Sequence, residues 1–303
     1  MSNENKGIVL VTGGLGFVGS NLVDRLVDLG REVLVVDNLS TGRIENSNPK
    51  ATVIVADFVE LAKRFLDGDR EHAELLEQVT DVYHLAAMTR IQPSFDEPVG
   101  SIELNTIGTV AACELAKKVG ARVVYAGSSS FYGGVYKNPY TFSKWQGEEV
   151  CRMYSEIFGV QTRVARFFNV YGPRHLSDGE YAPVVAIFER QYRDGAPLII
   201  TGTGEQRRDF THVHDICSGL ICMGEDETGG TATYNLGTGT NHSINELAAL
   251  FGGEVKHIPA RSGEAWESLA DIEATREAYD NWLPSKTLEK YVEDFKSKQD
   301  KER

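Results

Sequence analysis

The chain has 303 residues, of which 41% are hydrophobic and 25% are charged, a composition typical of a soluble globular protein. Its 44 acidic and 31 basic side chains give a formal net charge of −13, which repels a phosphate backbone and argues against nucleic acid as a partner. No apolar run approaches the roughly 20 residues that span a bilayer, so we expect no membrane partner either.

The first predicted elements are a strand, a glycine-rich turn and a helix. Residues 7–12 form a short β-branched run, the sequence GGLGFVG follows, and residues 21–29 carry apolar side chains at helical spacing. The polar start, MSNENKG, has neither the basic region nor the small-residue cleavage site of a secretory signal. We therefore expect a cytoplasmic protein.

The next predicted elements alternate between strands and helices. Several apolar runs are near-continuous, as in the strands of a parallel sheet that is covered on both faces. These runs are residues 32–36, 51–56, 81–85, 122–126 and 161–168. Helical patterns at residues 99–118 and 140–158 lie between them. The sequence therefore predicts an α/β fold, a Rossmann-type doubly wound parallel sheet with a smaller C-terminal substrate-binding lobe.

The pattern changes after Tyr171, where loops rich in Gly, Pro and Asp separate short elements. This change predicts a second lobe beside the carboxyl ends of the strands, where open parallel sheets bind their ligands. We assign residues 1–169, with a returning segment at about 208–238, to the domain that is built on this sheet. Residues 170–207 and 239–303 are assigned to the substrate-binding lobe, and the crevice between the two parts is the expected active site.

The glycine-rich turn has the spacing of a dinucleotide-binding fingerprint. Gly13, Gly16 and Gly19 stand between a strand and a helix, where the turn must be tight and the backbone must approach a pyrophosphate. Asp37 ends the next strand, where a carboxylate accepts hydrogen bonds from ribose hydroxyls and repels a 2′-phosphate. NAD is therefore favoured over NADP, although Arg43 is an alternative partner for such a phosphate.

Tyr140 and Lys144 are candidates for acid–base chemistry. They stand at i and i+4, on one face of a helix that Pro139 introduces. A free phenol has a pKa of ~10 and is a poor base at neutral pH, but a neighbouring ammonium and a cationic nicotinamide favour its phenolate form. The alternative interpretation is a pair of ordinary helix-surface residues.

Two segments, SSSFYG and PYTFSK, resemble the extended short-chain dehydrogenase/reductase family, in particular its UDP-glucose and UDP-N-acetylglucosamine 4-epimerases. The segments TGGLGFVGS, VVDNLSTG, HLAA, LNTIGT, RFFNVYGP and RRDFTHVHD match the same family along nearly the whole chain. In that family the hydroxyl residue four before the tyrosine of the YG pair is catalytic, which implies a triad of Ser128, Tyr140 and Lys144. The link GGVYKNP is much shorter than the family usually has at this place.

The resemblance implies cofactor contacts along the first half of the chain. Asp57 is expected beside adenine, with a turn or a helix cap as the alternative. The other implied NAD contacts are Gly13, Gly16, Phe17, Val18, Asp37, Asn38, Ser40, Thr41, Gly42, Phe58, Leu85, Ala86, Ala87, Asn105, Tyr140, Lys144 and Phe167.

The resemblance also implies how a UDP-sugar binds. Arg208, Arg261 and Asn169 are expected at the diphosphate and Glu264 at the uridine ribose, with surface arginines as the alternative for the first two. Ser268 stands where this family has either a bulky aromatic or a small residue, and a small one admits an N-acetyl group at C2. The other implied substrate contacts are Thr89, Ser128, Ser130, Tyr140 and Val184.

No metal site is predicted. His212 and His214 have strand-like spacing that suggests a metal pair, but no third ligand is evident, so we interpret them as structural. The cysteines have neither metal-type CxxC spacing nor a secreted disulfide pattern, and they are expected to be reduced and buried. They are Cys113, Cys151, Cys217 and Cys222.

Together with these features, the resemblance implies an NAD-dependent nucleotide-sugar 4-epimerase that acts through a 4-keto sugar. The expected substrates are UDP-glucose and UDP-galactose, together with UDP-GlcNAc and UDP-GalNAc. The alternatives are a nucleotide-sugar dehydratase, a UDP-glucuronate decarboxylase or 4-epimerase, a plain dehydrogenase, and a non-catalytic NAD-binding protein. By resemblance, the helices near residues 99–118 and 140–158 are expected to form a homodimer interface.

Overall fold

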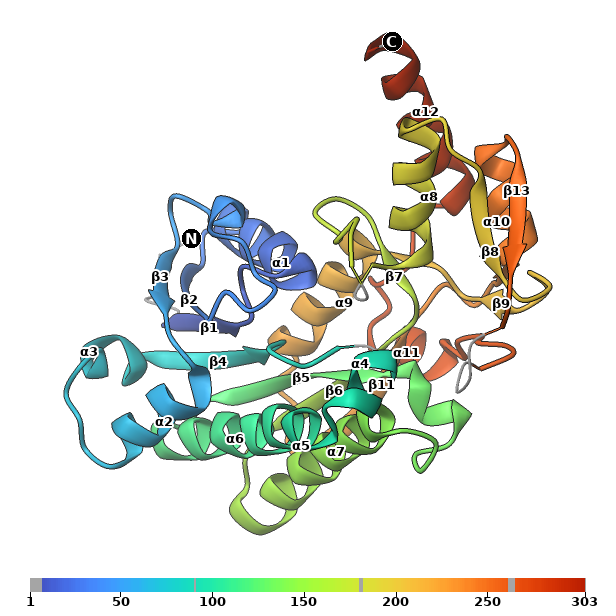
Figure 1. Ribbon diagram of the computed structural model, residues 1–303. Helices are drawn as coiled ribbons and strands as arrows, with labels where there is room; N and C mark the ends of the chain where they lie inside the picture. The colour runs from blue at the N-terminus through green and yellow to red at the C-terminus, as the bar shows by residue number, and fades with distance from the viewer. Residues whose placement is uncertain (1–6, 90, 180–181, 261–264, 303) are drawn as a thin grey trace.

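A parallel β-sheet forms the centre of the molecule (Figure 1). The structure, a computed structural model, describes residues 7–89, 91–179, 182–260 and 265–302. The sheet has seven strands in the order β11-β6-β5-β4-β1-β2-β3, and each neighbouring pair is parallel. The strands are β1 (Ile8–Thr12), β2 (Glu32–Asp37), β3 (Thr52–Val55), β4 (Val79–His84), β5 (Arg122–Ser128), β6 (Thr162–Phe167) and β11 (Thr231–Leu236).

The central strands are buried on both faces, as the near-continuous apolar runs predict. Every residue of β1 is buried, and its side chains alternate between two cores. Leu10 packs into one core, whereas Val9 and Val11 pack into the other. The predicted doubly wound α/β fold is confirmed.

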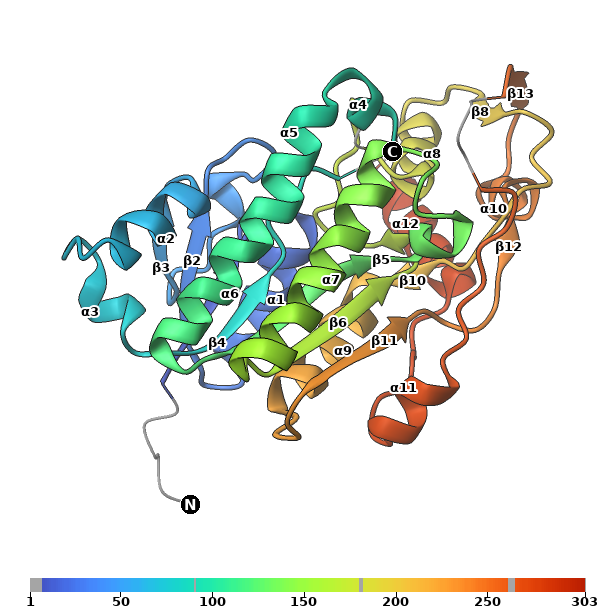
Figure 2. The ribbon, with the colours of Figure 1, turned by 90° about the horizontal axis from the view of Figure 1, so that it is seen from below.

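Helices cover both faces of the sheet (Figure 2). Helices α2, α6 and α7 pack on one face, and α1 and α9 pack on the other. They are α1 (Phe17–Asp28), α2 (Phe58–Leu66), α6 (Gly108–Val119), α7 (Pro139–Phe158) and α9 (Val213–Glu225). The shorter segments are α3 (Ala73–Leu76), α4 (Ile91–Asp96), α5 (Pro98–Ile102), α11 (Glu273–Ala278), the 3₁₀ turns η1 (Ile44–Asn46) and η3 (Ser129–Gly133), and the π-helical turn η2 (Glu103–Ile107).

The helix that carries the YxxxK pair has clear start and stop signals. The Asn138 side chain accepts a hydrogen bond from the Thr141 backbone N–H, and Pro139 occupies the first turn. Helix α7 ends at Phe158 and is capped by Gly159, whose φ of +72° favours glycine. Among the described helices, none has both the length and the apolar character needed to cross a membrane.

A smaller lobe lies beside the carboxyl ends of the strands (Figure 1). Its core includes apolar side chains from three helices, among them Phe188, Leu247 and Val292, and others from short strands and loops. Strand β8 pairs with β13, β9 with β12, and β7 with β10. The elements are β7 (Val170–Tyr171), α8 (Val184–Arg193), β8 (Leu198–Thr201), β9 (Arg207–Arg208), β10 (Thr211–His212), β12 (His242–Ser243), α10 (Ile244–Phe251), β13 (Val255–Ile258) and α12 (Leu288–Glu302).

The chain passes between the sheet and the lobe more than once. After the first lobe segment it returns to form α9 and the edge strand β11. Tyr279 and Trp282, which the sequence analysis grouped with the lobe, pack into the same core as α1 and α9. The Trp282 indole N–H donates to the Asp215 carbonyl at 2.9 Å, which ties this late segment to α9.

Candidate active site

The glycine-rich turn leaves the backbone open at the start of α1. Gly13 has a φ of +68°, and a Cβ there would lie 2.8 Å from the backbone N of Ala86. A Cβ on Gly19 would lie 2.1 Å from the Gly13 carbonyl oxygen, so only glycine allows the helix to approach the turn this closely. The residues of this segment that line the cleft are Gly13, Gly16, Phe17, Val18 and Gly19. Such a cradle fits a pyrophosphate at a helix amino terminus.

Asp37 joins this turn to the loop that follows β2. Its carboxylate accepts hydrogen bonds from the backbone N–H groups of Leu15 (3.0 Å) and Leu39 (2.8 Å), and it lines the cleft. A Cβ on Gly42 would lie 2.5 Å from this carboxylate, so the loop closes tightly around it. A 2′-phosphate at this wall of the cleft would meet a fixed negative charge, which favours NAD over NADP.

Most of the predicted cofactor residues line the same cleft. Asp57 does so and also caps α2, because its side chain accepts the Glu60 backbone N–H at 3.0 Å. The cap interpretation of Asp57 is therefore confirmed, and its contact with adenine stays a prediction. The other lining residues from that prediction are Asn38, Ser40, Thr41, Phe58, Leu85, Ala86, Ala87 and Phe167.

Gly42 and Asn105 are not among the described residues that line the cleft. Gly42 instead allows the loop to pass Asp37, as described above. Asn105 is buried, and its side chain bonds the backbone N–H (2.8 Å) and carbonyl (3.1 Å) of Met88. It also donates to the Ser143 hydroxyl at 2.9 Å. Asn105 therefore ties the segment after β4 to α7.

The three predicted catalytic residues are brought together at the end of β5. Ser128 ends the strand, and Tyr140 and Lys144 stand on α7. The Tyr140 hydroxyl donates to the Ser128 hydroxyl at 3.2 Å, and the Ser128 and Ser130 hydroxyls are 2.9 Å apart. The Tyr140 backbone N–H donates to the Ser94 hydroxyl at 3.0 Å, which holds the first turn of the helix.

Lys144 is buried beside an aromatic ring. Its ammonium lies 4.4 Å from the centroid of Tyr125, whose hydroxyl donates to the Lys144 carbonyl at 3.2 Å. Burial lowers the pKa of Lys144 from 10.5 to about 8, and the negative charge of Glu148 partly opposes this shift. Burial, with a smaller effect of Lys144, also lowers the pKa of His84 to about 3 and keeps its ring neutral.

Three of the predicted substrate residues, Asn169, Arg208 and Ser268, lie on the lobe side of the cleft. The Asn169 amide donates to the Ser268 hydroxyl at 2.8 Å and to the Asp209 carbonyl at 3.2 Å. Arg208 donates to the backbone carbonyls of Arg207 (2.9 Å) and Trp266 (3.3 Å). The predicted substrate residues that line the cleft are Thr89, Ser128, Ser130, Tyr140, Asn169, Val184, Arg208 and Ser268. Arg261 and Glu264 lie outside the described residues.

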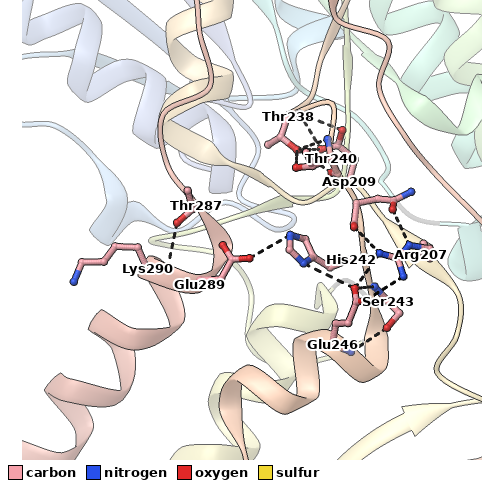
Figure 3. Close-up of polar contacts among 11 residues, drawn as sticks. Arg207, Asp209, Thr238, Thr240, His242, Ser243, Glu246, Thr287, Glu289 and Lys290 are labelled. Atoms are coloured by element: carbon pink, nitrogen blue, oxygen red, sulfur yellow. Dashed lines mark hydrogen bonds and ion pairs between the residues drawn. The ribbon is translucent and has the colours of Figure 1, made fainter.

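Asp209 organises this side of the cleft, although no sequence pattern predicts a role for it. The carboxylate is fully buried and accepts the backbone N–H groups of Thr238, Gly239 and Ala270 at 2.9 to 3.1 Å. Figure 3 shows Asp209 beside Thr238 and Thr240, with Arg207 turned toward Ser243 and Glu246. The motif RRDFTHVHD was recognised, but a buried carboxylate that gathers backbone N–H groups from distant segments leaves no local sequence signal.

The two histidines of that motif have structural contacts. The His212 ring nitrogen Nδ1 accepts the His214 backbone N–H at 3.1 Å and so caps α9. Burial lowers the pKa of His212 to about 4, so its ring is neutral at physiological pH. Within the described parts of the chain, no cluster of three or more His, Cys, Asp or Glu residues has the arrangement of a metal site.

A single cleft joins these features. It has a volume of about 1090 Å³ and extends from the glycine-rich turn, past Ser128 and Tyr140, to Arg208 and Ser268. The sheet supplies one wall and the lobe the other, as expected for an open parallel sheet. The cleft therefore has a glycine-rich end that suits a dinucleotide, an acid–base centre, and an opposite end lined by Arg208.

A model of the NAD dependent epimerase/dehydratase family matches residues 9–237. The chain belongs to this family. As an epimerase/dehydratase it is an enzyme with NAD as its cofactor, and the glycine cradle and Asp37 fit that dinucleotide.

Two relatives of this epimerase/dehydratase have different activities. The chain is 33% identical to the UDP-glucose 4-epimerase of Mycolicibacterium smegmatis, over 95% of this chain and 98% of that protein. It is 32% identical to UDP-glucuronic acid decarboxylase 1 of Xenopus tropicalis, over 95% of this chain and 71% of that protein. Overall identity therefore does not separate the two reactions.

Solved structures share the fold of this epimerase/dehydratase over nearly its whole length. The Thermotoga maritima UDP-glucose 4-epimerase with UDP-glucose has a TM-score of 0.85 and 29% identity, over 96% of this chain and 99% of that one. The Thermus thermophilus UDP-glucose 4-epimerase with NAD has a TM-score of 0.82 and 28% identity, over 95% and 99%. The UDP-N-acetylglucosamine 4-epimerase of Methanobrevibacter ruminantium, in complex with UDP-N-acetylmuramic acid, has a TM-score of 0.83 and 29% identity, over 96% and 99%.

Proposed function

We propose that this enzyme inverts C4 of a UDP-hexose. The observation that carries the proposal is the contact of the Tyr140 and Ser128 hydroxyls, 3.2 Å apart and beside the buried Lys144. These groups stand in one cleft between the dinucleotide end and Arg208. A sugar whose diphosphate is held at Arg208 therefore reaches both the acid–base groups and the cofactor.

The residues of the chain handle the proton of the reaction. NAD, when bound, accepts a hydride from the sugar carbon and returns it. Tyr140 takes the 4-hydroxyl proton and later gives it back, while Ser128 bonds the same sugar oxygen. Lys144, a cation below pH of about 8, favours the Tyr140 phenolate. Because the sugar is oxidised and then reduced, the reaction causes no net redox change.

The nucleotide end anchors the substrate while the sugar turns. Inversion requires the keto sugar to present its other face between the two hydride transfers, so the protein must grip the UDP more firmly than the sugar. Arg208 and Asn169 are assigned to the diphosphate, where a guanidinium makes strong charge-assisted hydrogen bonds. Arg261 and Glu264 are assigned to the diphosphate and the uridine ribose from the sequence alone.

The composition of the catalytic turn favours epimerisation over decarboxylation or dehydration. Those reactions are expected to use an acidic group beside the catalytic hydroxyl, and here Ser129 and Ser130 follow Ser128. The carboxylates among the described lining residues are Asp37, Asp57 and Glu267. Asp37 and Asp57 accept backbone N–H groups, and Glu267 accepts the Asn241 amide at 2.8 Å. None of the three belongs to the turn that follows Ser128.

Ser268 is assigned to substrate choice. Its small side chain lines the cleft and accepts a hydrogen bond from the Asn169 amide. We expect this position to leave room for a C2 N-acetyl group, so UDP-GlcNAc and UDP-GalNAc are proposed as substrates together with UDP-glucose and UDP-galactose.

A homodimer and a cytoplasmic location complete the proposal. Helices α5, α6 and α7 lie side by side on one face of the molecule (Figure 2). Apolar side chains are exposed along α5, η2 and α7, and a second copy of the chain would cover them. They are Val99, Ile102, Ile107, Met153, Ile157 and Phe158. A reducing compartment suits the four cysteines, all of which are free.

One experiment tests the reaction and its rivals together. Purified protein is incubated with UDP-GlcNAc, UDP-glucose or UDP-glucuronate, and the sugars are followed by proton NMR with simultaneous absorbance at the reduced-nicotinamide band. The expected result is the C4 epimer of UDP-GlcNAc and of UDP-glucose with no lasting reduced cofactor. Carbon dioxide release with a pentose product, a deoxy-keto sugar, or stoichiometric reduced cofactor would each overturn the proposal in favour of a different reaction.

A further inference from the structure

A buried ion pair, Glu148 with Arg166, lies next to the turn that follows Ser128. The side chains of Glu148 and Arg166 are 5% and 12% exposed. Arg166 donates to the Glu148 carboxylate through Nε (3.0 and 3.2 Å) and Nη2 (2.6 Å). Glu148 lies one helical turn after Lys144 on α7, and Arg166 lies on β6. The pair therefore joins the helix that carries Tyr140 to the sheet.

The same arginine contacts the turn that follows Ser128. The Arg166 guanidinium carbon lies 3.5 Å from the ring centroid of Phe131, and Nη1 donates to the Tyr132 hydroxyl at 3.2 Å. The Tyr132 hydroxyl in turn donates to Asn235 on β11 at 2.9 Å. Phe131 and Tyr132 belong to η3, the 3₁₀ turn that continues from Ser128. Arg166 therefore holds this turn and α7 at the same time.

The absence of a side chain at Gly127 leaves space in the sheet for the Glu148–Arg166 ion pair. Gly127, which immediately precedes Ser128, is paired with Arg166 in the register of β5 and β6. A Cβ on Gly127 would lie 3.0 Å from a Glu148 carboxylate oxygen and 3.2 Å from the Arg166 Cγ. Apolar side chains of similar volume often stabilise a protein as well as a buried ion pair does. Stability alone therefore does not explain charged groups here.

We propose that Glu148 and Arg166 form a positioning pair, which holds the Ser128–Ser130 turn at hydrogen-bonding distance from Tyr140. The readout by turnover rests on the proposed epimerase function, but the positional claim does not. Loss of either charge leaves its partner buried and unpaired, so the turn is released from α7 and the contact between Ser128 and Tyr140 is lost. Misplacement of catalytic groups by about 1 Å lowers a rate about 100-fold.

The test compares this pair with a second ion pair on the same strand. Arg163 on β6 and Asp226 have side chains that are 3% and 11% exposed, and they are 2.7 Å apart. Neither is among the described residues that line the cleft.

Glu148→Gln and Arg166→Met are expected to lower kcat about 10- to 100-fold with unchanged KM and NAD affinity. The double variant is expected to lose no more than either single variant, because both act through one contact. Asp226→Asn is expected to keep the wild-type kcat despite a lower melting temperature.

A second measurement does not require turnover. Amide hydrogen exchange of residues 128–133 is expected to be faster in Glu148→Gln than in wild type, and unchanged in Asp226→Asn. Equal losses of kcat in Glu148→Gln and Asp226→Asn, or unchanged exchange in Glu148→Gln, would overturn the positioning role. If the wild-type protein epimerises no UDP-sugar while exchange in the turn still responds to Glu148→Gln, the epimerase proposal fails and the positioning pair stands.

Discussion

Lys144 shows at the scale of one residue how the fold prepares a group for chemistry. Its ammonium is buried over Tyr125, and Tyr125 fits there because Gly147 has no side chain. A Cβ on Gly147 would lie 2.2 Å from the Tyr125 hydroxyl oxygen. The pair Tyr140 and Lys144 was predictable from its spacing on the helix, but this support was not, because it depends on an aromatic ring from strand β5.

Replacement of Lys144 by Met tests how much the buried charge lowers the free energy of unfolding, separately from the role of that charge beside Tyr140. Burial lowers the pKa of Lys144 from 10.5 to about 8, so between these pH values the folded protein binds fewer protons than the unfolded chain. The free energy of unfolding of the wild type therefore rises with pH over this interval, through Lys144, and that rise is absent in Lys144→Met. Below pH 8 the variant is expected to be more stable by up to about 3 kcal/mol, and the difference is expected to close toward pH 10.5.

Urea unfolding at several pH values, without NAD, measures this effect. A stability difference between Lys144→Met and wild type that stays constant from pH 7 to pH 10.5 would contradict it. Epimerisation by Lys144→Met is expected to fall at least about 100-fold at pH 7, where Lys144 of the wild type is a cation, because the phenolate of Tyr140 loses that neighbouring charge.

Arg208 is expected to act in binding more than in chemistry. Loss of a charge-assisted hydrogen bond to a phosphate weakens binding by about 1.5 to 3 kcal/mol, so Arg208→Met is expected to raise KM for the UDP-sugar about 10- to 100-fold. Steady-state kinetics measures this change, and kcat is expected to change much less. Arg70, an exposed arginine paired with Glu77 and outside the described cleft lining, serves as the matched control. A fall in kcat with normal KM would contradict the assignment of Arg208.

Residue roles were predictable where they follow a local pattern. The glycine-rich turn, Asp37 and the YxxxK pair each occupy a recognisable place at a strand end or on a helix face. Other roles depend on contacts between segments that are distant in the sequence, and no residue spacing predicts them. These are the roles of Asp209, Glu148 and Arg166. The side chain of Asn105 bonds Met88 and Ser143 between β4 and α7, and its contact with NAD stays a prediction.

The loop after β2 allows a prediction at the scale of an element. Gly42→Ala places a methyl group 2.5 Å from the Asp37 carboxylate, so the loop must move away from the adenosine end of the cleft. We expect NAD affinity to fall about tenfold, as measured by calorimetry on cofactor-free protein, because one binding wall is displaced. Gly229→Ala is the matched control, since a Cβ there has no neighbour within 4 Å and the residue has no positive φ. Equal affinity of both variants for NAD would show that the loop tolerates the methyl group.

The helices were easier to predict than their boundaries. Helix α1 begins at Phe17 and not at residue 21, because Gly16 caps it with extended backbone and no side-chain hydrogen bond. The predicted helix at residues 99–118 is three connected segments, α5, the π-helical turn η2 and α6. Asn105 lies in that π-helical turn, and its amide bonds Met88 and Ser143. Apolar periodicity detects such a run but not a local change in helix type.

At the scale of the whole molecule, the proposed dimer makes a direct prediction. Ile157 on α7 is 66% exposed, and a carboxylate there would be buried without a partner if two copies met at this face. Wild-type protein is expected to be a dimer in light scattering, and Ile157→Asp is expected to be a monomer. Leu29, which is 60% exposed at the end of α1 on the other side of the sheet, is the control, and Leu29→Asp is expected to remain a dimer. A monomeric wild type would overturn the proposed assembly.

The sheet was predictable as a whole because its buried strands have near-continuous apolar sequences, while the lobe was not predictable in detail. Its short strands, such as β9 and β12, are ordered by contacts between distant segments. Residues 279–282 lie on the face of the sheet that α1 and α9 cover, because Tyr279 and Trp282 pack into that core. The local sequence does not reveal this packing.

The helix α12 also has a consequence for how the enzyme is made. The lobe core includes Leu288 and Val292 from this last helix, whereas the glycine-rich turn and the Ser128, Tyr140 and Lys144 group all precede residue 145. During synthesis most of the nucleotide-binding half therefore leaves the ribosome well before the lobe can close its core. The core around α1 is nevertheless also completed late, because it includes Tyr279 and Trp282, so both halves depend on the last part of this chain to emerge.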